Sequence, residues 1–112
     1  MLIAGNDYTF EVQIKSPMGW VKVDASIHIL SETAFTGQAK LLGFTVALTD
    51  CVLDGSHVRF AASPKLPFGA LRVEIEADVH EDDAVSGIAN APRHKPMEIR
   101  GHLTGSAAAQ II

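Results

Sequence analysis

The sequence has little sulfur, few aromatic residues and no motif that identifies a reaction. Its 112 residues include one cysteine, one tryptophan and one tyrosine. The single thiol, Cys51, cannot form an internal disulfide, and we expect it to pack as a small hydrophobe in a reducing compartment. No CxxC spacing, phosphate-binding glycine loop or Ser/His/Asp arrangement is present. The sequence therefore excludes a disulfide scaffold and leaves enzymatic activity an open question.

Positive charge and long apolar runs are also scarce. The chain has 9 Lys and Arg against 13 Asp and Glu, a formal net charge of −4 at pH 7. Nucleic-acid binding relies on basic patches. No apolar run approaches the ~20 residues of a membrane span, and no basic region followed by an apolar one marks a secretory signal. We expect one cytoplasmic domain over residues 1–112, with no nucleic-acid partner and no membrane partner.

What the sequence does contain is a self-similarity with a fixed period. Glycines and turn motifs recur 50 residues apart: Gly5, Gly55 and Gly105, and Pro17-Met18-Gly19 with Pro67-Phe68-Gly69. A fixed period sets the architecture of a fold. We predict two equivalent halves, residues 5–54 and 55–104, followed by an apolar tail over residues 106–112.

Alternation of apolar and polar residues predicts strands joined by short turns. The predicted strands are eight: residues 8–15, 21–29, 35–41, 44–53, 58–62, 71–79, 85–91 and 96–103. Asp54-Gly55 is a strong hairpin signal. Because no stretch has helical apolar spacing over more than two turns, we predict an all-β fold.

Strands joined in sequence order form an up-and-down meander, and closing it removes both exposed edges. We therefore predict an eight-stranded antiparallel up-and-down barrel; the alternative is a two-sheet β-sandwich of the same strands. Eight strands leave an interior just wide enough to pack side chains or hold one small ligand.

The same alternation predicts which residues are buried. Apolar positions of the second strand of each half should face the core: Val21, Val23, Ile27, Val73, Ile75 and Val79. Their polar neighbours should face solvent: Lys22, Asp24, Arg72 and Glu74. The aromatic residues expected in the core are Tyr8, Phe10, Phe35, Phe44 and Phe60.

Three turn and strand motifs stand out in the sequence: a Thr/Ser-Pro-Met-Gly turn, a Leu/Phe-Thr/Ser-Gly third strand and a Leu-Asp-Gly hairpin. The matching residues are 16–19 and 66–69, 35–37 and 85–87, and 53–55. This combination resembles a group of small bacterial calycin-like barrels, which are similar in plan to lipocalins and avidins. The resemblance implies a small, mostly apolar ligand in the barrel mouth. Residues 91–96 depart from it, because they replace a plain glycine turn.

The eighth predicted strand differs most from its counterpart. Alternate residues of a strand share a face, so Glu98, Arg100 and His102 form a row that carries an acid, a cation and an imidazole. If this row faces inward, these residues are candidates for catalysis, because buried charges pair or do chemistry. If it faces outward, Met97, Ile99 and Leu103 face the core.

The candidate ligand-binding residues are the core aromatics, a tryptophan near one rim and one cation: Tyr8, Phe10, Trp20, Phe60 and Arg100. We expect no metal site, because His94 and His102 lie about 26 Å apart along a strand at ~3.3 Å per residue. We also expect no cofactor.

Three functions compete. The first is binding of a small, largely apolar molecule in the barrel, and the second is an isomerase or lyase that uses the polar row. The third is an assembly module without a ligand. A cavity of roughly 300 Å³ or more supports the first two. A homodimer is expected, because the apolar tail and the rim residues Trp20, Leu42 and Phe68 would otherwise be exposed.

Overall fold

The computed structural model describes residues 2–17, 19–66, 69–70 and 72–107, in which every regular element is a strand. The strands are β1 (Asp7–Ser16), β2 (Gly19–Ile29), β3 (Phe35–Leu41), β4 (Phe44–Ala47), β5 (Thr49–Asp54), β6 (His57–Ala62), β7 (Lys65–Leu66), β8 (Gly69–Ala70), β9 (Val73–Val79), β10 (Ala84–Asn90) and β11 (Met97–Ala107). Phe68, Leu71 and the tail from residue 108 lie outside the described residues. No helix long and apolar enough to cross a membrane occurs in the described part of the chain.

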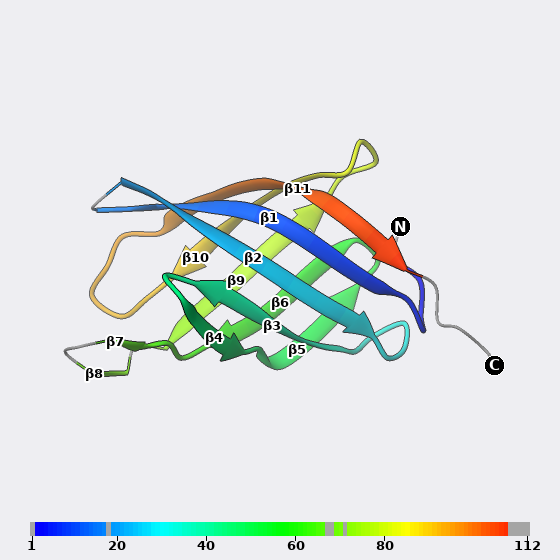
Figure 1. The fold of residues 1–112 in the computed structure, drawn as a ribbon, viewed down its shortest axis with the longest axis horizontal. Coiled ribbons are helices and arrows are strands. Elements are labelled where there is room, and N and C mark those ends of the chain that lie inside the picture. The colour runs from blue at the N-terminus through cyan, green and yellow to red at the C-terminus, as the bar shows by residue number, and fades with distance from the viewer. Residues whose placement is uncertain (1, 18, 67–68, 71, 108–112) are drawn as a thin grey trace.

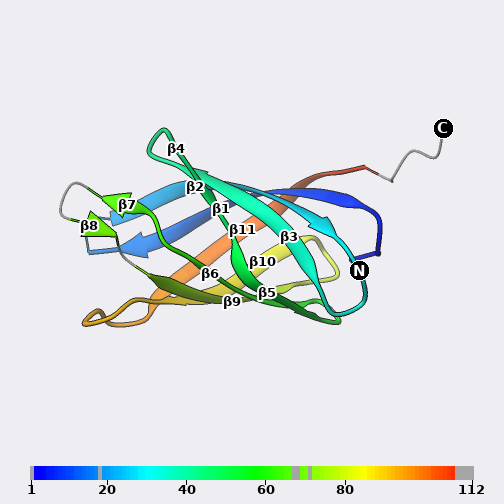
Figure 2. The same cartoon turned by 90° about the horizontal axis from the view of Figure 1, so that it is seen from below.

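The strands form one long antiparallel meander that curls on itself (Figures 1 and 2). The main sheet has the order β4-β3-β2-β1-β11-β10-β9-β6-β5, and β7 and β8 make a separate small hairpin. The prediction of eight strands was therefore wrong: among the described residues the main sheet has nine.

The additional strand arises because the predicted strand 44–53 is broken. β4 ends at Ala47 and β5 begins at Thr49, with Leu48 between them. Asp50 has a positive φ of 53°, and the β5–β6 register shifts between Thr49 and Val52. An irregularity of this kind bends a strand and reverses which face its side chains occupy. For this reason Leu48 and Leu53 are both buried, although residues five positions apart would face opposite sides of a regular strand.

The broken segment closes the barrel at one end. Ala34 forms an antiparallel bridge with Val52, and the Leu53 amide donates to the Thr33 carbonyl at 2.9 Å. The Leu48 amide donates to the Gly37 carbonyl at 3.0 Å. These bonds join β5, one end strand of the sheet, to β3 and the residues before it; β3 is the neighbour of the other end strand, β4. The molecule is a nearly closed antiparallel barrel, as predicted in general plan, and not a two-sheet sandwich.

Strand registers in the two halves of the chain differ by the period seen in the sequence. β1 pairs with β2 at Asp7↔His28, and β6 pairs with β9 at His57↔Asp78. The fourth strand differs between the halves. In the first half it is divided into β4 and β5, whereas in the second half β11 is continuous and pairs with both β10 and β1.

Burial follows the predicted alternation in β2 and β9. Val23, Ile27, Ile75 and Val79 are buried, and Val21 and Val73 are partly buried. The four polar neighbours named above are exposed.

The aromatic predictions hold with one exception. Tyr8, Phe10 and Phe35 are buried and Phe60 is half-buried. Phe44 is 61% exposed, so its assignment to the core was wrong. Phe44 pairs with Leu41 at the start of β4, and β4 is an end strand of the sheet that pairs, among the described residues, with β3 alone.

Candidate functional site

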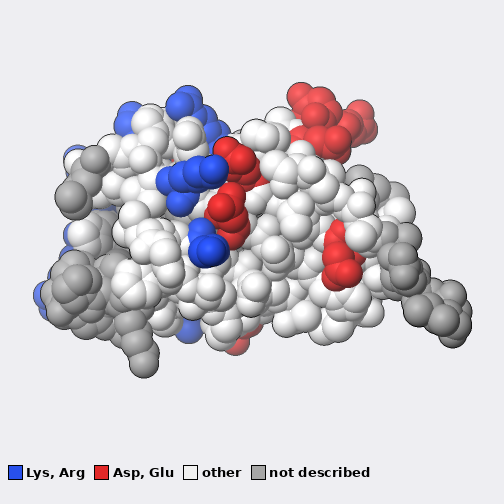
Figure 3. Space-filling model, in the orientation of Figure 1, with Lys and Arg blue, Asp and Glu red and all other residues white. Residues whose placement is uncertain are grey.

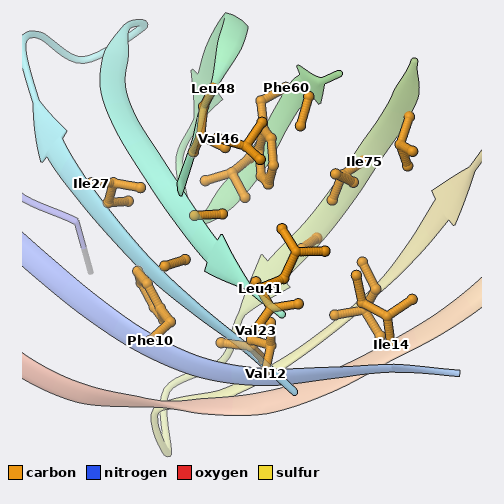
Figure 4. Close-up of a pocket in the computed structure, with 18 of the residues that line it drawn as sticks. Phe10, Val12, Ile14, Val23, Ile27, Leu41, Val46, Leu48, Phe60 and Ile75 are labelled. Carbon is orange, nitrogen blue, oxygen red and sulfur yellow. The ribbon is translucent and has the colours of Figure 1, made fainter. Parts of the chain in front are cut away.

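The barrel encloses an apolar cavity of about 130 Å³. Side chains from six segments of the barrel converge on it in Figure 4: Phe10, Val12, Ile14, Val23, Ile27, Leu41, Val46, Leu48, Phe60 and Ile75. Among the side chains that the structure describes, all those that line the cavity are apolar, and none of them can be ionised. Among the described residues no polar or charged side chain is buried.

Small residues account for the space. Ala25, Ala39, Ala62 and Ala77 line the cavity from four different strands, where larger side chains would fill the interior of a barrel of this size. Phe35 and Phe60 pack edge to face across it, with ring centroids 6.1 Å apart and an interplanar angle of 87°. The inward alanines were the sequence signal for a cavity, and our sequence reasoning did not use it.

One end of the barrel is sealed. Tyr8 is buried there, and its hydroxyl accepts a hydrogen bond from the Ile3 amide at 2.9 Å. Ile29 and Leu53 are buried at the same end. Tyr8, a predicted ligand-binding residue, therefore packs as part of the sealed end and does not line the cavity.

The break at Leu48 leaves one edge of β4 without a described partner strand. Among the described residues β4 pairs with β3 alone, whereas β6 pairs with β5 and β9. Val46 of β4 and Pro64, which follows β6, line the cavity from the two sides of this unpaired gap. We infer that the gap is the mouth of the cavity. An ion pair between Arg72 and Asp50, at 2.9 Å, lies beside it and links the start of β9 to β5.

The predicted catalytic row does not enter the barrel. Glu98, Arg100 and His102 are exposed on the outer face of β11, while Ile99 is buried and Met97, Gly101 and Leu103 are partly buried. The alternative that needed the polar row inside is therefore not supported by its position.

The predicted ligand-binding residues separate into two groups. Phe10 and Phe60 line the cavity. Trp20 and Arg100 lie outside it, and the Arg100 guanidinium stacks on the indole with its Cζ 3.9 Å from the ring centroid. Such a cation–π contact contributes about 0.5–1 kcal/mol at an exposed site.

Trp20 lines a second, shallower depression of about 440 Å³ on the outer surface. The depression lies between the start of β2 and the turn that joins β3 to β4, and its walls include Lys22, Lys40 and Leu42. The sequence placed Trp20 near a rim but did not predict this groove.

Two imidazoles of the outer face pair with carboxylates. Nδ1 of His28 lies 2.6 Å from Asp7, and Nδ1 of His57 lies 2.8 Å from Asp78. His57 lies 50 residues after Asp7, and Asp78 lies 50 residues after His28. The imidazole and the carboxylate therefore exchange positions between the two pairs. No group of three His, Cys, Asp or Glu side chains in the described part of the chain could hold a metal ion.

Cys51 is half-buried in β5 and packs against the core. Burial, and secondly the negative charge of Asp50, raise the pKa of the thiol above its ordinary value. A raised pKa lowers the thiolate fraction, so this position is unsuited to a nucleophile.

Comparison with protein-family models, with curated proteins and with solved structures found no match.

Proposed function

We propose that this chain binds a small, wholly apolar molecule inside the barrel. The observation that supports the proposal is a cavity of about 130 Å³ in the barrel, whose described lining side chains are all apolar. A buried polar ligand group would find no hydrogen-bond partner there, and an unsatisfied buried group costs about 1–3 kcal/mol.

The volume limits the size of the ligand. The cavity is smaller than the roughly 300 Å³ of an ordinary ligand pocket and close to the ~150 Å³ of an apolar protein cavity that stays dry and binds benzene. A single ring or a short branched alkyl chain fits such a space. With a ceiling of about 1.5 kcal/mol per non-hydrogen atom, a six-carbon ligand gains at most about 9 kcal/mol and binds with a Kd no lower than about 0.3 μM.

Catalysis is not part of the proposal. The described residues of the cavity lining provide no group that can accept or donate a proton, and the Glu98, Arg100 and His102 side chains face the outside. An isomerase or lyase acting in the cavity would need at least one titratable group at the reacting atoms.

We further propose that the barrel is of the calycin-like kind, with two equivalent halves, in a cytoplasmic protein. The nearly closed meander and strand registers that differ by 50 residues support the first two points. The single free thiol of Cys51 is compatible with a reducing compartment.

Benzene, cyclohexane and phenol test the ligand proposal by calorimetry and thermal unfolding. Benzene at ten times its Kd should raise the free energy of unfolding by about 1.4 kcal/mol. Phenol should bind at least about tenfold more weakly, because its hydroxyl would lose hydrogen bonds to water.

Cavity variants provide the matched comparison. Ala25→Leu places a larger side chain in the cavity and should abolish the benzene effect, whereas Ser26→Ala, at the exposed neighbouring position of β2, should leave it unchanged. Circular dichroism would confirm that both variants are folded. Absence of any stabilisation by benzene or cyclohexane would contradict the proposal.

A further inference from the structure

The turn that joins β3 to β4 is strained and presents an apolar side chain to solvent. Leu42 and Gly43 both have positive φ, 50° and 81°, as a two-residue turn of type I′ requires. Asparagine, aspartate or glycine suits such a position, and a bulky residue there is a genuine outlier. Leu42 is also 70% exposed, more than the other large apolar side chains described. The tip therefore carries a leucine at a cost in stability, without any gain in burial within the monomer.

Other apolar side chains lie at the same end of the barrel. Trp20 lines the outer groove with Leu42, and Phe44 begins β4 with 61% of its surface exposed. We call Trp20, Leu42 and Phe44 the apolar lip. Exposed apolar residues that gather in this way mark interaction surfaces.

The end that carries the apolar lip is basic. Cations occur where strands end or turn there: Lys15, Lys22, Lys40, Arg93, Lys95 and Arg100, all exposed. In the described part of the chain, Lys15, Lys40, Arg93 and Lys95 form no ion pair. Five acids lie among these cations. Glu11 pairs with Lys22, and Asp50 and Glu74 both pair with Arg72. Asp24 lies in the wall of the outer groove, and Glu98 is exposed on β11.

The opposite end is acidic. Its turns carry Glu32, Asp54, Glu81, Asp82 and Asp83, all exposed. Figure 3 shows this polarity on one face: Lys and Arg lie over the left half, and a dense acidic group lies at the upper right.

The acidic end has apolar side chains of its own. Ile3 and Leu30 are 55% and 58% exposed there. Each end of the barrel thus combines exposed apolar surface with an excess of one sign of charge.

We propose that the apolar lip and its surrounding cations dock on the acidic end of a second copy of this chain. Opposite charges at the two ends complement each other, and Leu42 and Phe44 of one copy would cover Ile3 and Leu30 of the next. Pairing of two basic ends across a two-fold axis would bring like charges together, which is unfavourable. A head-to-tail contact leaves one free end of each kind, so chains of copies or a closed ring can form. The contact does not depend on the proposed ligand, because it involves only outer surfaces.

Complementary blocking variants test the direction of the contact in the full chain. Lys40→Glu with Leu42→Asn blocks the basic end, and Glu32→Lys with Glu81→Lys blocks the acidic end. The unmodified protein should associate at low salt, with a Kd at least tenfold weaker in 0.5 M salt, by sedimentation and light scattering. Each blocked variant alone should be monomeric, and their equimolar mixture should form a dimer and nothing larger.

Two further measurements separate docking from unfolding and from charge effects in general. Leu42→Asn alone should raise Tm, because asparagine tolerates a positive φ, while it weakens association at least tenfold. The control Arg59→Glu makes the same charge change on the exposed side of β6 and should leave the mass unchanged.

An unmodified protein that is monomeric at 0.5 mM and low salt would overturn the proposal. So would self-association of the acidic-end variant, because that result indicates a lip-to-lip dimer. A mixture of the two blocked variants that remains monomeric would overturn it as well. Binding of the lip to anionic vesicles without any effect of Lys40→Glu and Leu42→Asn on mass would assign the surface to a membrane instead.

Discussion

Single residues without a side chain determine how closely the strands of this barrel approach. A Cβ atom built on Gly37 would lie 2.3 Å from the Ser26 carbonyl oxygen, and one on Gly87 would lie 2.3 Å from the Glu76 carbonyl oxygen. Both contacts are with backbone atoms of the neighbouring strand, which cannot move without disturbing the sheet. The two glycines lie 50 residues apart, at corresponding positions of β3 and β10.

Gly87→Ala should therefore lower the free energy of unfolding by about 3 kcal/mol, the upper part of the range for overpacking. Gly55→Ala is the control. A Cβ at Gly55 meets nothing within 4 Å, and the cost there comes only from its φ of 61°. That cost should be about 1–2 kcal/mol. Urea titration measures both, and an equal or smaller cost for Gly87→Ala would refute the close approach.

Leu42 illustrates what residue patterns alone do not reveal. The sequence identified Gly43 as the residue that precedes a strand and named Leu42 as a rim candidate, but not that the leucine itself adopts a positive φ. A leucine is a poor choice for that conformation, so no propensity rule would place it there. The strain becomes visible only in the structure.

At the scale of elements, period-two alternation located most strands and their faces. β2, β3 and β9 lie within one or two residues of their predicted bounds. The sequence did not decide which face of β11 points inward, because either face could be interpreted as the buried one. In the structure Ile99 is buried and Glu98 is exposed. Alternation cannot choose between a polar outer face and a functional polar interior.

The broken fourth strand was missed for a physical reason. Residues 44–53 alternate well enough to suggest one strand, and Leu48 gives no turn signal. The break depends on Asp50, which adopts a positive φ and forms an ion pair with Arg72 from the start of β9. A contact between positions 22 residues apart in the chain cannot be predicted from local pattern. The mouth of the cavity follows from this break and was therefore not predicted either.

The register of β9 gives a prediction at this scale. Ile75 is buried and lines the cavity, whereas Glu74 is exposed. Ile75→Ala should cost about 2–5 kcal/mol through lost burial and an enlarged cavity, and Glu74→Ala roughly 0.5 kcal/mol or less. Denaturant unfolding of the two variants compares the faces of one strand. Similar losses for both would mean that the strand is shifted by one residue.

For the whole molecule, the two chain ends lie on adjacent strands. Asp7 of β1 pairs with Ala107 of β11, and both are continuous with the rest of the barrel (Figure 1). Strand pairing at this seam forms without a connecting hairpin. The cavity was not predictable at this scale, because strand number alone allows either a filled interior or one small ligand. The inward alanines decide between them.

The seam leads to the last prediction, a circular permutant. Joining residue 112 to residue 1 and opening the chain between Gly55 and Ser56 cuts no strand, since β5 ends at Asp54 and β6 begins at His57. The permuted chain exchanges the order of the two halves. β5 and β6 would then lie near opposite ends of the chain and pair without a connecting turn, as β1 and β11 do in the original chain. Because exposed turns tolerate new termini, we expect cooperative unfolding and a loss of no more than about 2 kcal/mol in the free energy of unfolding, roughly 10 °C in Tm.

As the control, a permutant opened between Glu76 and Ala77 cuts β9, which pairs on both sides, and should not fold. Thermal unfolding followed by circular dichroism distinguishes the two, and failure of the first permutant would show that the two halves depend on their order in the chain.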